Sequence, residues 1–556
     1  MDLAAAHEIT LELLQLGGEL GLWAQKCRWA GLNNLEFSRD FLVNIDLCRE
    51  FSFPQNSDPF VLLGMTITIK NPPASRQFVL IFAFVDLTSP IGDSRSYPES
   101  TTFMPSIAQG HWALRLASLD PMFVGALLHD TETTAILKDN DFFLNYVPTT
   151  STPLPKFNIK DLKVLGGGDT TNSIVRVTLD TPIGLQRVVF KSYLRLLEHN
   201  IEAEVISQLH AVGFSAVPAL EGSLTLVWGG RSYTLLMVSQ FVENDGDGGK
   251  PFWDHLQEYL RASRSQNNLT PILQRINPLA QLIGRTTREF HEALSKSKEQ
   301  SFLPEKVDIS DVAAWSGEFR ENFANMARIC SHRLPQLFLQ LLPATSDLIM
   351  KLLSFLQRYV KKYPLVDSSF VPIKQRIHGD LHLGQFLFQS GDPAPRFIVT
   401  DLEGDPQLPP ERRREKRTVW FDLGGLLRAL DYIAFFGVWE ILKQLIPSYQ
   451  WSAEDIFACF FERLTARPVP KPLEQHRNQW EPTVENATKW VEIVGSQILQ
   501  GYFPKESLPE KLPFAFKFLR ATSELNYELG FRGQNALVPL LGVLTTGRMW
   551  VGKKMP

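Results

Sequence analysis

Two short acidic segments in the second half of the chain have the residue types that phosphoryl transfer requires. Asp380 lies in a His-Gly-Asp turn, and Asp401 comes just after an apolar stretch, residues 397–399. Phosphoryl transfer needs a carboxylate that orients the attacking hydroxyl and accepts its proton, and oxygen ligands for the Mg²⁺ on the nucleotide phosphates. We therefore predict that Asp380 is the catalytic base and that Asp401 binds the metal ion.

Further candidate ligands lie close to these two residues. Mg²⁺ takes hard oxygen ligands, usually one or two carboxylates together with phosphate and water. The Gln385 amide and the Glu403 carboxylate are the additional candidates, and whether either binds the metal directly stays open. Asp401 and Glu403 are two residues apart, so in an extended chain both side chains leave the same face. His382 is predicted to contact the substrate, and His378 to be structural.

The same segment admits a second chemistry. His378, Asp380 and His382 are spaced i, i+2, i+4, and from a strand they would face one metal ion together. A metallohydrolase site of this kind leaves the upstream lysine and glycine-rich loop without a role. Phosphoryl transfer is therefore the preferred interpretation.

The upstream lysine, Lys191, ends an apolar strand and precedes a predicted helix, residues 199–211. Kinases use such a lysine to bind the α- and β-phosphates, and a glutamate on the following helix to hold it. Helical geometry places Glu204 nearest the apolar stripe of Ile201, Val205 and Leu209, so we predict it as the partner. The candidate partners of Lys191 are Glu198, Glu202 and Glu204.

A glycine-rich loop, residues 166–173, precedes this lysine. Gly166 and Gly168 match the first two places of a G-x-G-x-x-G pattern, but Thr171 fills the last place. The match is incomplete and carries little weight alone. We predict Gly168 and Thr171 as contacts of the nucleotide phosphates.

Hydrophobic periodicity predicts the elements that must position these residues. A hairpin is expected from residues 62–70 and 78–87, a linker at 243–250, and mostly helix beyond it. Five strands are expected around the 199–211 helix, at residues 157–165, 174–179, 185–193, 223–227 and 233–241. This order predicts an α+β, two-lobed protein-kinase-like fold. Three domains are predicted: an N-terminal α+β cap (1–92), a β-rich N-lobe that binds nucleotide phosphates (93–243), and a helical C-lobe with the catalytic and sugar-binding site (244–556).

Composition excludes several other classes of protein. The 556 residues are 44% hydrophobic and 21% charged, which does not fit collagen, a coiled coil or a largely disordered chain. The net charge of −4 gives no general attraction to nucleic acid or to an anionic membrane. The longest apolar run, residues 78–85, is far shorter than the ~20 residues of a membrane-spanning helix. We expect a soluble cytoplasmic protein with no nucleic-acid or membrane partner and no signal peptide.

Two charged segments follow the acidic motifs. Residues 411–417 are mostly basic, and in a net acidic chain we expect a solvated or phosphate-proximal loop there rather than a nucleic-acid site. Asp422, Arg428 and Asp431 follow on an apolar helix. We expect them to form a buried salt-bridge network that supports the loop.

Taken together, these motifs resemble those of the bacterial maltokinases, which belong to the aminoglycoside-phosphotransferase-like, protein-kinase-like superfamily. The resemblance runs from about residue 162 to the C-terminus. It implies ATP- and Mg²⁺-dependent phosphorylation of a sugar, for maltokinases of maltose to maltose 1-phosphate, with links to glycogen and trehalose metabolism and to trehalose synthase. It also implies that Gln240 and Val242 contact the nucleotide. The segments that carry it are residues 240–248, 377–385, 400–406, 411–414 and 422–432.

The sugar-binding helix of the maltokinases resembles residues 520–528 of this chain, with departures. Maltokinases usually have Lys, Tyr and Tyr where this chain has Arg520, Ser523 and Tyr527. Glu524 and Glu528 suit an aminosugar instead, as in the related glucosamine kinases. Maltose is the first predicted acceptor and an aminosugar the second, and a non-catalytic pseudokinase is the remaining alternative. The predicted substrate residues are His382, Arg520, Glu524 and Tyr527.

Overall fold

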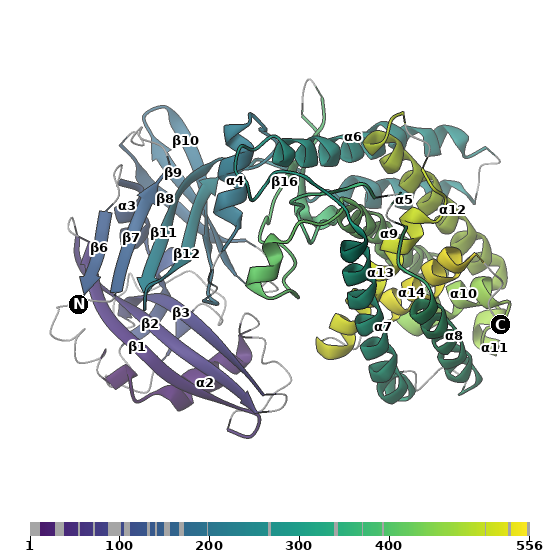
Figure 1. Ribbon diagram of the computed structural model, residues 1–556, viewed down its shortest axis with the longest axis horizontal. Helices are drawn as coiled ribbons and strands as arrows, with labels where there is room; N and C mark the ends of the chain where they lie inside the picture. Colours follow the sequence, from purple (N-terminus) through teal and green to yellow (C-terminus); the bar gives the residue numbers. More distant parts are fainter. Residues whose placement is uncertain are drawn as a thin grey trace. The chain divides into compact units, whose positions relative to one another are not determined.

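The computed structural model forms two compact units, shown in Figure 1 and each described here by itself. The first comprises Met1–Ser207 and Pro218–Val242, and the second Gln208–Val217 and Glu243–Pro556. The division after Val242 lies one residue from the predicted limit between N-lobe and C-lobe. The structure describes residues 10, 12–27, 30, 38–53, 56–70, 73–86, 102–104, 112–129, 134–139, 142–149, 156–165, 172–196, 198, 200–264, 268–337, 343–367, 369, 371–391, 394–505, 508–531 and 535–552.

An antiparallel sheet begins the first unit, in the order β1-β2-β3-β5-β4. The predicted hairpin is β2–β3, where Lys70 pairs with Pro73. The sheet extends beyond the predicted cap limit at residue 92, because β5 pairs with β3 through Phe82–Leu116 and its neighbours. The elements are α2 (Gly17–Lys26), β1 (Phe41–Phe53), β2 (Asn56–Lys70), β3 (Pro73–Asp86), β4 (Thr102–Phe103) and β5 (Trp112–Leu116).

A second antiparallel sheet in this unit has seven strands, in the order β6-β7-β11-β12-β10-β9-β8. The five predicted strands and the predicted helix are all present. Two strands that were not predicted, β6 and β7, extend the sheet past β11. The elements are β6 (Thr134–Asp139), β7 (Phe142–Pro148), β8 (Asn158–Val164), β9 (Ser173–Thr181), β10 (Gly184–Ser192), α4 (Glu202–Ala211), β11 (Leu220–Trp228) and β12 (Arg231–Gln240).

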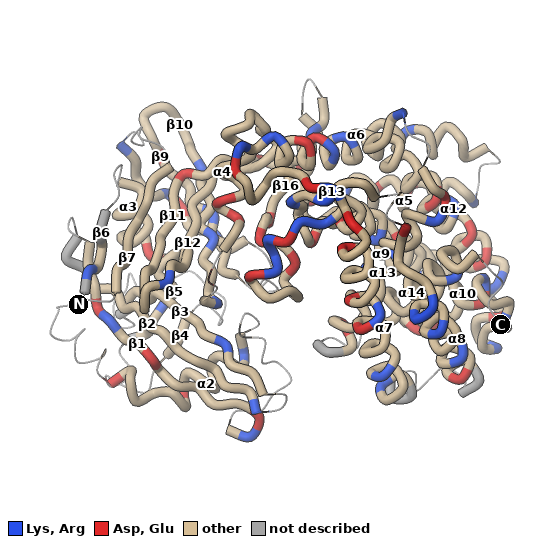
Figure 2. Tube along the Cα trace, in the orientation of Figure 1, with Lys and Arg blue, Asp and Glu red and all other residues tan. Residues whose placement is uncertain are grey.

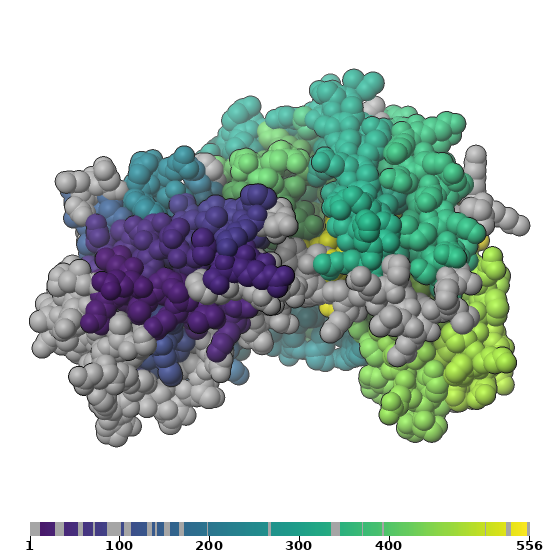
Figure 3. Space-filling model, turned by 90° about the horizontal axis from the view of Figure 1, so that it is seen from below, coloured from purple at the N-terminus to yellow at the C-terminus, as the bar shows by residue number. Residues whose placement is uncertain are grey.

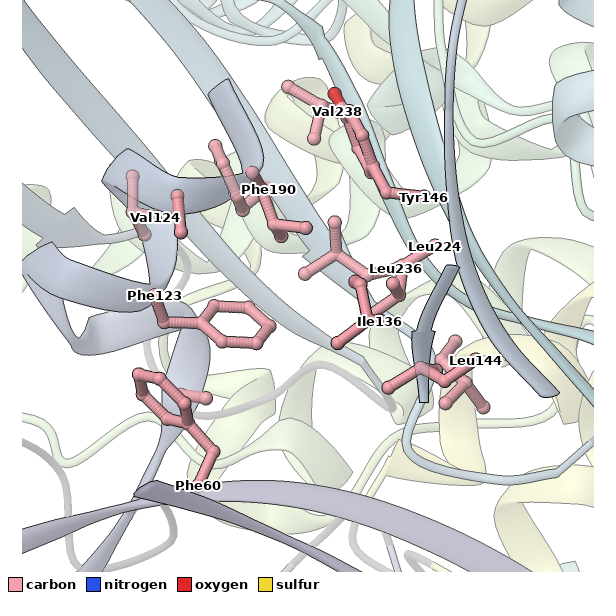
Figure 4. Packing of buried hydrophobic residues seen from close by; sticks show 14 of the residues in the cluster. Phe60, Phe123, Val124, Ile136, Leu144, Tyr146, Phe190, Leu224, Leu236 and Val238 are labelled. Atoms are coloured by element: carbon pink, nitrogen blue, oxygen red, sulfur yellow. The ribbon is translucent and has the colours of Figure 1, made fainter. Parts of the chain in front are cut away.

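The two sheets share one hydrophobic core. Phe60 of β2 packs on Phe123 of α3 (Pro121–His129), with ring centroids 5.3 Å apart. Figure 4 shows Phe123 beside Phe60, in the same cluster as Leu144 and Phe190 of the larger sheet. The backbone also joins the sheets, since Val79 N–H donates to the Leu194 carbonyl at 3.0 Å. The cap and the lobe predicted as separate domains therefore fold around common buried surface.

The second unit is built mainly of helices. The predicted apolar helix at its centre is α9, which is buried on most sides, as expected for a helix that is apolar nearly all round. On the outside, α7 and α8 pack together and form a continuous surface (Figure 3). The helices are α5 (Lys250–Ala262), α6 (Thr270–Ser295), α7 (Ile309–Leu337), α8 (Pro343–Lys362), α9 (Trp420–Leu445), α10 (Ala453–Thr465), α11 (Lys471–Glu474), α12 (Arg477–Tyr502), α13 (Leu512–Phe531) and α14 (Leu537–Val551).

Two short hairpins complete this unit, β13 (Glu305–Lys306) with β14 (Ile373–Lys374) and β15 (Phe386–Gln389) with β16 (Arg396–Val399). The 3₁₀ turns of this unit are Leu383–Gln385 and Pro410–Arg414, and a third, Ala117–Leu119, lies in the first unit. No helix among the described residues is long and apolar enough to cross a bilayer.

Residues 243–250 are not the simple linker that was predicted. Asp245 N–H donates to the Phe388 carbonyl at 2.8 Å, and Phe388 N–H donates to the Gly246 carbonyl at 2.9 Å. Gly248 packs so closely that an added Cβ would lie 2.7 Å from the Leu383 carbonyl oxygen. The segment is therefore a fixed neighbour of β15, and its glycines serve close packing and turning rather than flexibility.

Candidate active site

The backbone of the Asp380 turn is held by a buried carboxylate. Asp422, near the start of α9, accepts hydrogen bonds from His378 N–H at 2.7 Å and from Gly379 N–H at 2.8 Å. Gly379 has a φ of 88°, a conformation that glycine adopts readily. Burial by itself raises the pKa of Asp422, but hydrogen bonds from His291 and from the turn outweigh it and lower the pKa below its ordinary value. The turn is thus set by a charged acceptor.

Two residues that sequence reasoning missed complete this support. His291 of α6 places Nε2 2.8 Å from an Asp422 oxygen, and its Nδ1 lies 2.8 Å from the Tyr502 hydroxyl of α12. Both lie on amphipathic helices, where no local pattern distinguishes them from other buried residues. His378 also has a structural contact, since its Nε2 lies 2.9 Å from the Thr400 carbonyl oxygen.

The candidate metal ligands lie just before β15 and just after β16. Gln385 donates its amide N–H to Asp401 Oδ2 at 3.0 Å, which leaves its amide oxygen as the atom for a cation. Oxygens of Asp401 and Glu403 lie within 4.8 Å of one another. These are hard oxygen ligands of the kind that Mg²⁺ prefers. The residues present therefore fit a divalent cation bound with nucleotide phosphates.

The backbone at Asp401 is not extended, so the prediction of two carboxylates on one face of a strand was wrong. Asp401 has a φ of 60° and Gly404 a φ of 77°, so the chain turns here instead of continuing the strand. Asp is among the few residues that tolerate this left-handed conformation. A tight turn, and not an extended i, i+2 pattern, brings Asp401 and Glu403 together.

Asp380 forms an ion pair with a residue predicted to bind substrate. Arg520 of α13 donates from Nη2 to Asp380 Oδ1 at 2.6 Å and from Nε to Glu524 Oε1 at 3.1 Å. Burial alone lowers the pKa of Arg520, but the carboxylates of Asp380, Glu524 and Asp405 outweigh it and raise the pKa above its ordinary value. The Arg520 guanidinium is therefore a permanent positive charge beside the candidate base.

Glu524 has a different setting from the one predicted. Its second oxygen accepts from Arg428 Nε at 3.0 Å, so both oxygens are bonded to arginines. Arg428 is fully buried and also pairs with Asp431 at 2.6 Å. The predicted network of Asp422, Arg428 and Asp431 forms only in part, because Asp422 bonds to His291 and to the Asp380 turn instead. Tyr527, the remaining predicted substrate residue of α13, is half-buried about one turn beyond Glu524.

His382 lies in the same region and is uncharged. Its Nδ1 accepts a hydrogen bond from Gly384 N–H at 3.1 Å and caps the 3₁₀ turn Leu383–Gln385. Burial lowers the pKa of His382, although the Asp380 carboxylate opposes that shift. With Nδ1 as acceptor, the proton is on Nε2, so the side chain offers one N–H donor.

In the first unit, Lys191 pairs with Glu202 and not with the predicted Glu204. Lys191 Nζ lies 2.7 Å from Glu202 Oε2, and both side chains are buried. The helix begins at Glu202, where the Asn200 side chain accepts from its N–H at 3.0 Å. The predicted stripe of Ile201, Val205 and Leu209 is buried as expected. Ile206 is buried as well, which widens the apolar face toward Glu202, while Glu204 is only half-buried.

Tyr193 was also missed. Its hydroxyl donates to the same Glu202 oxygen at 2.6 Å, so this oxygen receives both the ammonium and the phenol. The signal for it in the sequence is its position two residues after Lys191, where a strand turns side chains to the same face. Tyr193 therefore helps to fix Glu202, which in turn fixes Lys191.

The other predicted nucleotide contacts are less defined. Gly168 and Thr171 lie outside the described residues. Gln240 is the last residue of β12, where its N–H donates to the Ala219 carbonyl at 2.8 Å. Val242 is half-buried at the end of the first unit.

The basic segment 411–417 is charge-compensated. Arg412 and Arg417 both pair with Glu318 of α7, at 3.1 and 3.0 Å, and Arg412 pairs with Glu415 at 2.8 Å. Lys416 pairs with Glu305. Figure 2 shows Lys and Arg (blue) interleaved with Asp and Glu (red) near β13 of the second unit. Ion pairs therefore account for much of this charge, which does not favour a nucleic-acid surface.

These elements define a class of fold. A β-rich unit carries the Lys191–Glu202 pair, with Glu202 on α4, and a helical unit carries two acidic turns, which is the arrangement of protein-kinase-like proteins. A solved glucosamine kinase structure, crystal form B, is similar with a TM-score of 0.51 and 16% identity, covering 90% of this chain and 93% of that one. The fold is protein-kinase-like.

Sequence comparisons point to particular relatives. A glucosamine kinase of Streptacidiphilus jiangxiensis is 25% identical over 330 residues, 57% of this chain and 66% of that protein. A glucosamine kinase of Mycolicibacterium smegmatis is 40% identical over 57 residues, 10% of this chain and 13% of that protein. The chain thus matches less than two thirds of the length of either curated relative. No protein-family model matches it.

Proposed function

We propose that this chain is an ATP- and Mg²⁺-dependent kinase that phosphorylates a sugar hydroxyl. The observation that carries the proposal is the pairing of two turns in the second unit. One presents Asp380 on a backbone held by Asp422, and the other presents Asp401 with Gln385 and Glu403. The two curated relatives, both named glucosamine kinases, support the same reaction class.

Each proposed role follows from the chemistry of the side chain. Asp380 orients the acceptor hydroxyl and takes its proton as the oxygen bonds to the γ-phosphorus and ADP leaves. Asp401, Gln385 and Glu403 hold Mg²⁺, which supplies charge neutralisation on the phosphates. Lys191, fixed by Glu202, binds phosphate oxygens.

An aminosugar is the first proposed acceptor. Both curated relatives are named glucosamine kinases. Asp405 is a candidate partner of the ammonium group, because it lies in the electrostatic neighbourhood of Asp380 and Arg520. A positively charged amine is stabilised by such a carboxylate. Glu524 is a poorer candidate for this contact, because both its oxygens are bonded to arginines.

Maltose is the second candidate, favoured by the resemblance of residues 400–406 and 411–414 to maltokinases. If maltose is the acceptor, the product is maltose 1-phosphate, and the links to glycogen synthesis and trehalose synthase follow from that resemblance. These links stay predictions.

A panel of acceptors tests the proposal. ADP release from Mg·ATP should be measured with glucosamine, glucose, maltose, trehalose and an aminoglycoside. We expect turnover with glucosamine that glucose does not match. Turnover with maltose alone would support the proposed kinase reaction, with maltose and not glucosamine as the acceptor. ATP binding without turnover on any member would favour the pseudokinase alternative, and stoichiometric zinc or manganese without ATP binding would favour a metallohydrolase.

A further inference from the structure

A series of ion pairs with alternating charges begins at Asp380 and continues through the second unit. Arg520 is bonded to Asp380 and to Glu524, and Glu524 is bonded in turn to Arg428. Beyond Arg428, Asp431 accepts from Arg428 at 2.6 Å and from Lys517 at 3.1 Å. Every ion pair in this series joins opposite charges, and its far members are on α9 and α13.

The side chains in this series of ion pairs are poorly exposed to water. The Arg428 side chain is 1% exposed, that of Glu524 14% and that of Arg520 16%. Charges in such surroundings are screened much less by solvent and salt than surface pairs are. A buried charge must also be paired, because an unpaired one carries a large desolvation cost. The position of each group is therefore dictated by its neighbours.

The helices approach closely enough for this contact because α9 has two glycines in succession. A Cβ on Gly425 would overlap the carbonyl oxygen of Leu381, directly after Asp380, and would lie 3.9 Å from Arg520 Nε. A Cβ on Gly424 would lie 2.8 Å from the backbone of Phe516 on α13. Small residues at these two positions bring α13 and the catalytic turn against the same face of α9.

We propose that Arg520 is a positioning residue for Asp380, a role that rests on the proposed kinase function. Its guanidinium holds Oδ1 of Asp380, so that Oδ2 is the oxygen directed to the acceptor hydroxyl. Glu524, fixed by Arg428, holds Arg520 in that orientation. The arginine takes no proton itself, because it stays charged throughout.

Loss of the Arg520 guanidinium should lower kcat more than it changes KM. Without the guanidinium, Oδ1 of Asp380 loses the bond that fixes the carboxylate. In Arg520→Gln, kcat should fall about 10²-fold as the carboxylate becomes misplaced, while the KM for the acceptor changes less. Arg520→Lys keeps the charge without the planar fork, so kcat should fall by a smaller factor.

Chemical rescue separates positioning from a general structural role. Guanidinium ion added to Arg520→Ala should restore part of kcat, because it can occupy the vacated space beside Asp380. Glu524→Gln should lower kcat by a smaller factor, because Arg520 keeps its bond to Asp380. Arg477→Gln is the matched control, since Arg477 also pairs with glutamates, Glu462 at 2.6 Å and Glu474 at 2.7 Å, outside this site.

The outcomes separate failure of the proposed kinase function from failure of the proposed role of Arg520. If the wild-type chain turns over no acceptor, the kinase function and this inference both fail. If the wild type is active and Arg520→Gln keeps the wild-type kcat, the inference alone is rejected. Thermal melting of every variant checks folding, and Arg520→Lys carries the test if Arg520→Gln does not fold. Equal loss in Arg477→Gln, or no rescue by guanidinium, would show a structural effect only.

Discussion

The roles predicted for Asp380 and Asp401 rest on local sequence. Asp380 lies in a His-Gly-Asp turn and Asp401 follows an apolar stretch, and the structure places both segments in turns, where Gly379 and Asp401 have positive φ. The Arg520 contact with Asp380 was not predictable in the same way, since the two residues are 140 positions apart. The choice of Glu202 over Glu204 depends on Ile206, whose burial widens the apolar face of the helix toward Glu202.

The Lys191 pair gives the first prediction at this scale. Glu202→Gln should raise the KM for ATP at least tenfold, because Lys191 loses its charged partner. Tyr193→Phe should raise it several-fold, since Glu202 loses one donor worth about 1 kcal/mol. The measurement is initial-rate kinetics at varied ATP. Glu204→Gln, on the same helix, should change the KM far less, and a larger effect there would support the original prediction.

Asp422 gives a prediction about pH. Its pKa is lower in the folded protein than in the unfolded chain, so its contribution to stability is present above the unfolded value of about 3.9. That contribution is lost as the pH falls from about 4 through the folded pKa. Asp422→Asn should lower the free energy of unfolding by about 3 kcal/mol at neutral pH and weaken its dependence on acid. Urea titrations across pH test this, and an acid dependence as steep as in the wild type would contradict it.

At the scale of elements, predictability depended on whether a segment carries its own pattern. The strands within residues 157–241 alternate clearly and were found. The linker at 243–250 was misjudged because its polar residues and glycines look flexible, while its backbone bonds to β15 are invisible in the sequence. The strand β7 was missed because its place is set by pairing with β11, a partner distant in the chain, and β6 was missed with it because β6 pairs only with β7 in this sheet.

Helix packing at α9 gives a prediction of this scale. Gly425→Ala places a methyl group against the Leu381 carbonyl, so the catalytic turn must shift. We expect a loss of about 1–3 kcal/mol in stability, typical of overpacking, and a fall in kcat. Gly317→Ala on α7 is the control, because its Cβ meets nothing within 4 Å and should add about 0.5–1 kcal/mol of helix stability. Unchanged kcat in a folded Gly425→Ala variant would contradict the role given to this contact.

At the scale of the whole molecule, three domains were predicted, and the structure divides into two units with a break after Val242. The change from strand to helix patterns lies near this break. The predicted limit at residue 92 falls within a sheet, because β5 pairs with β3 and β4 pairs with β5. The shared core of the two sheets depends on Phe60 and Phe123, which no local pattern links.

The shared core predicts a single cooperative first unit. Phe123→Ala should cost about 3–5 kcal/mol, as for other buried phenylalanines. Hydrogen exchange should show lost protection in β2 of the smaller sheet and also in β11 of the larger one. Lost protection confined to β1–β3 would show that the cap unfolds independently.

The central claim is that Asp380 performs the chemistry of a sugar kinase. The most direct test compares single-turnover phosphorylation of glucosamine by the wild type and by Asp380→Asn, with Mg·ATP affinity measured by calorimetry on both. We predict that the variant binds Mg·ATP with near-normal affinity and loses at least 10³-fold in the rate of phosphoryl transfer, because orientation and proton acceptance fail together. A variant that transfers phosphate at close to the wild-type rate would contradict the account.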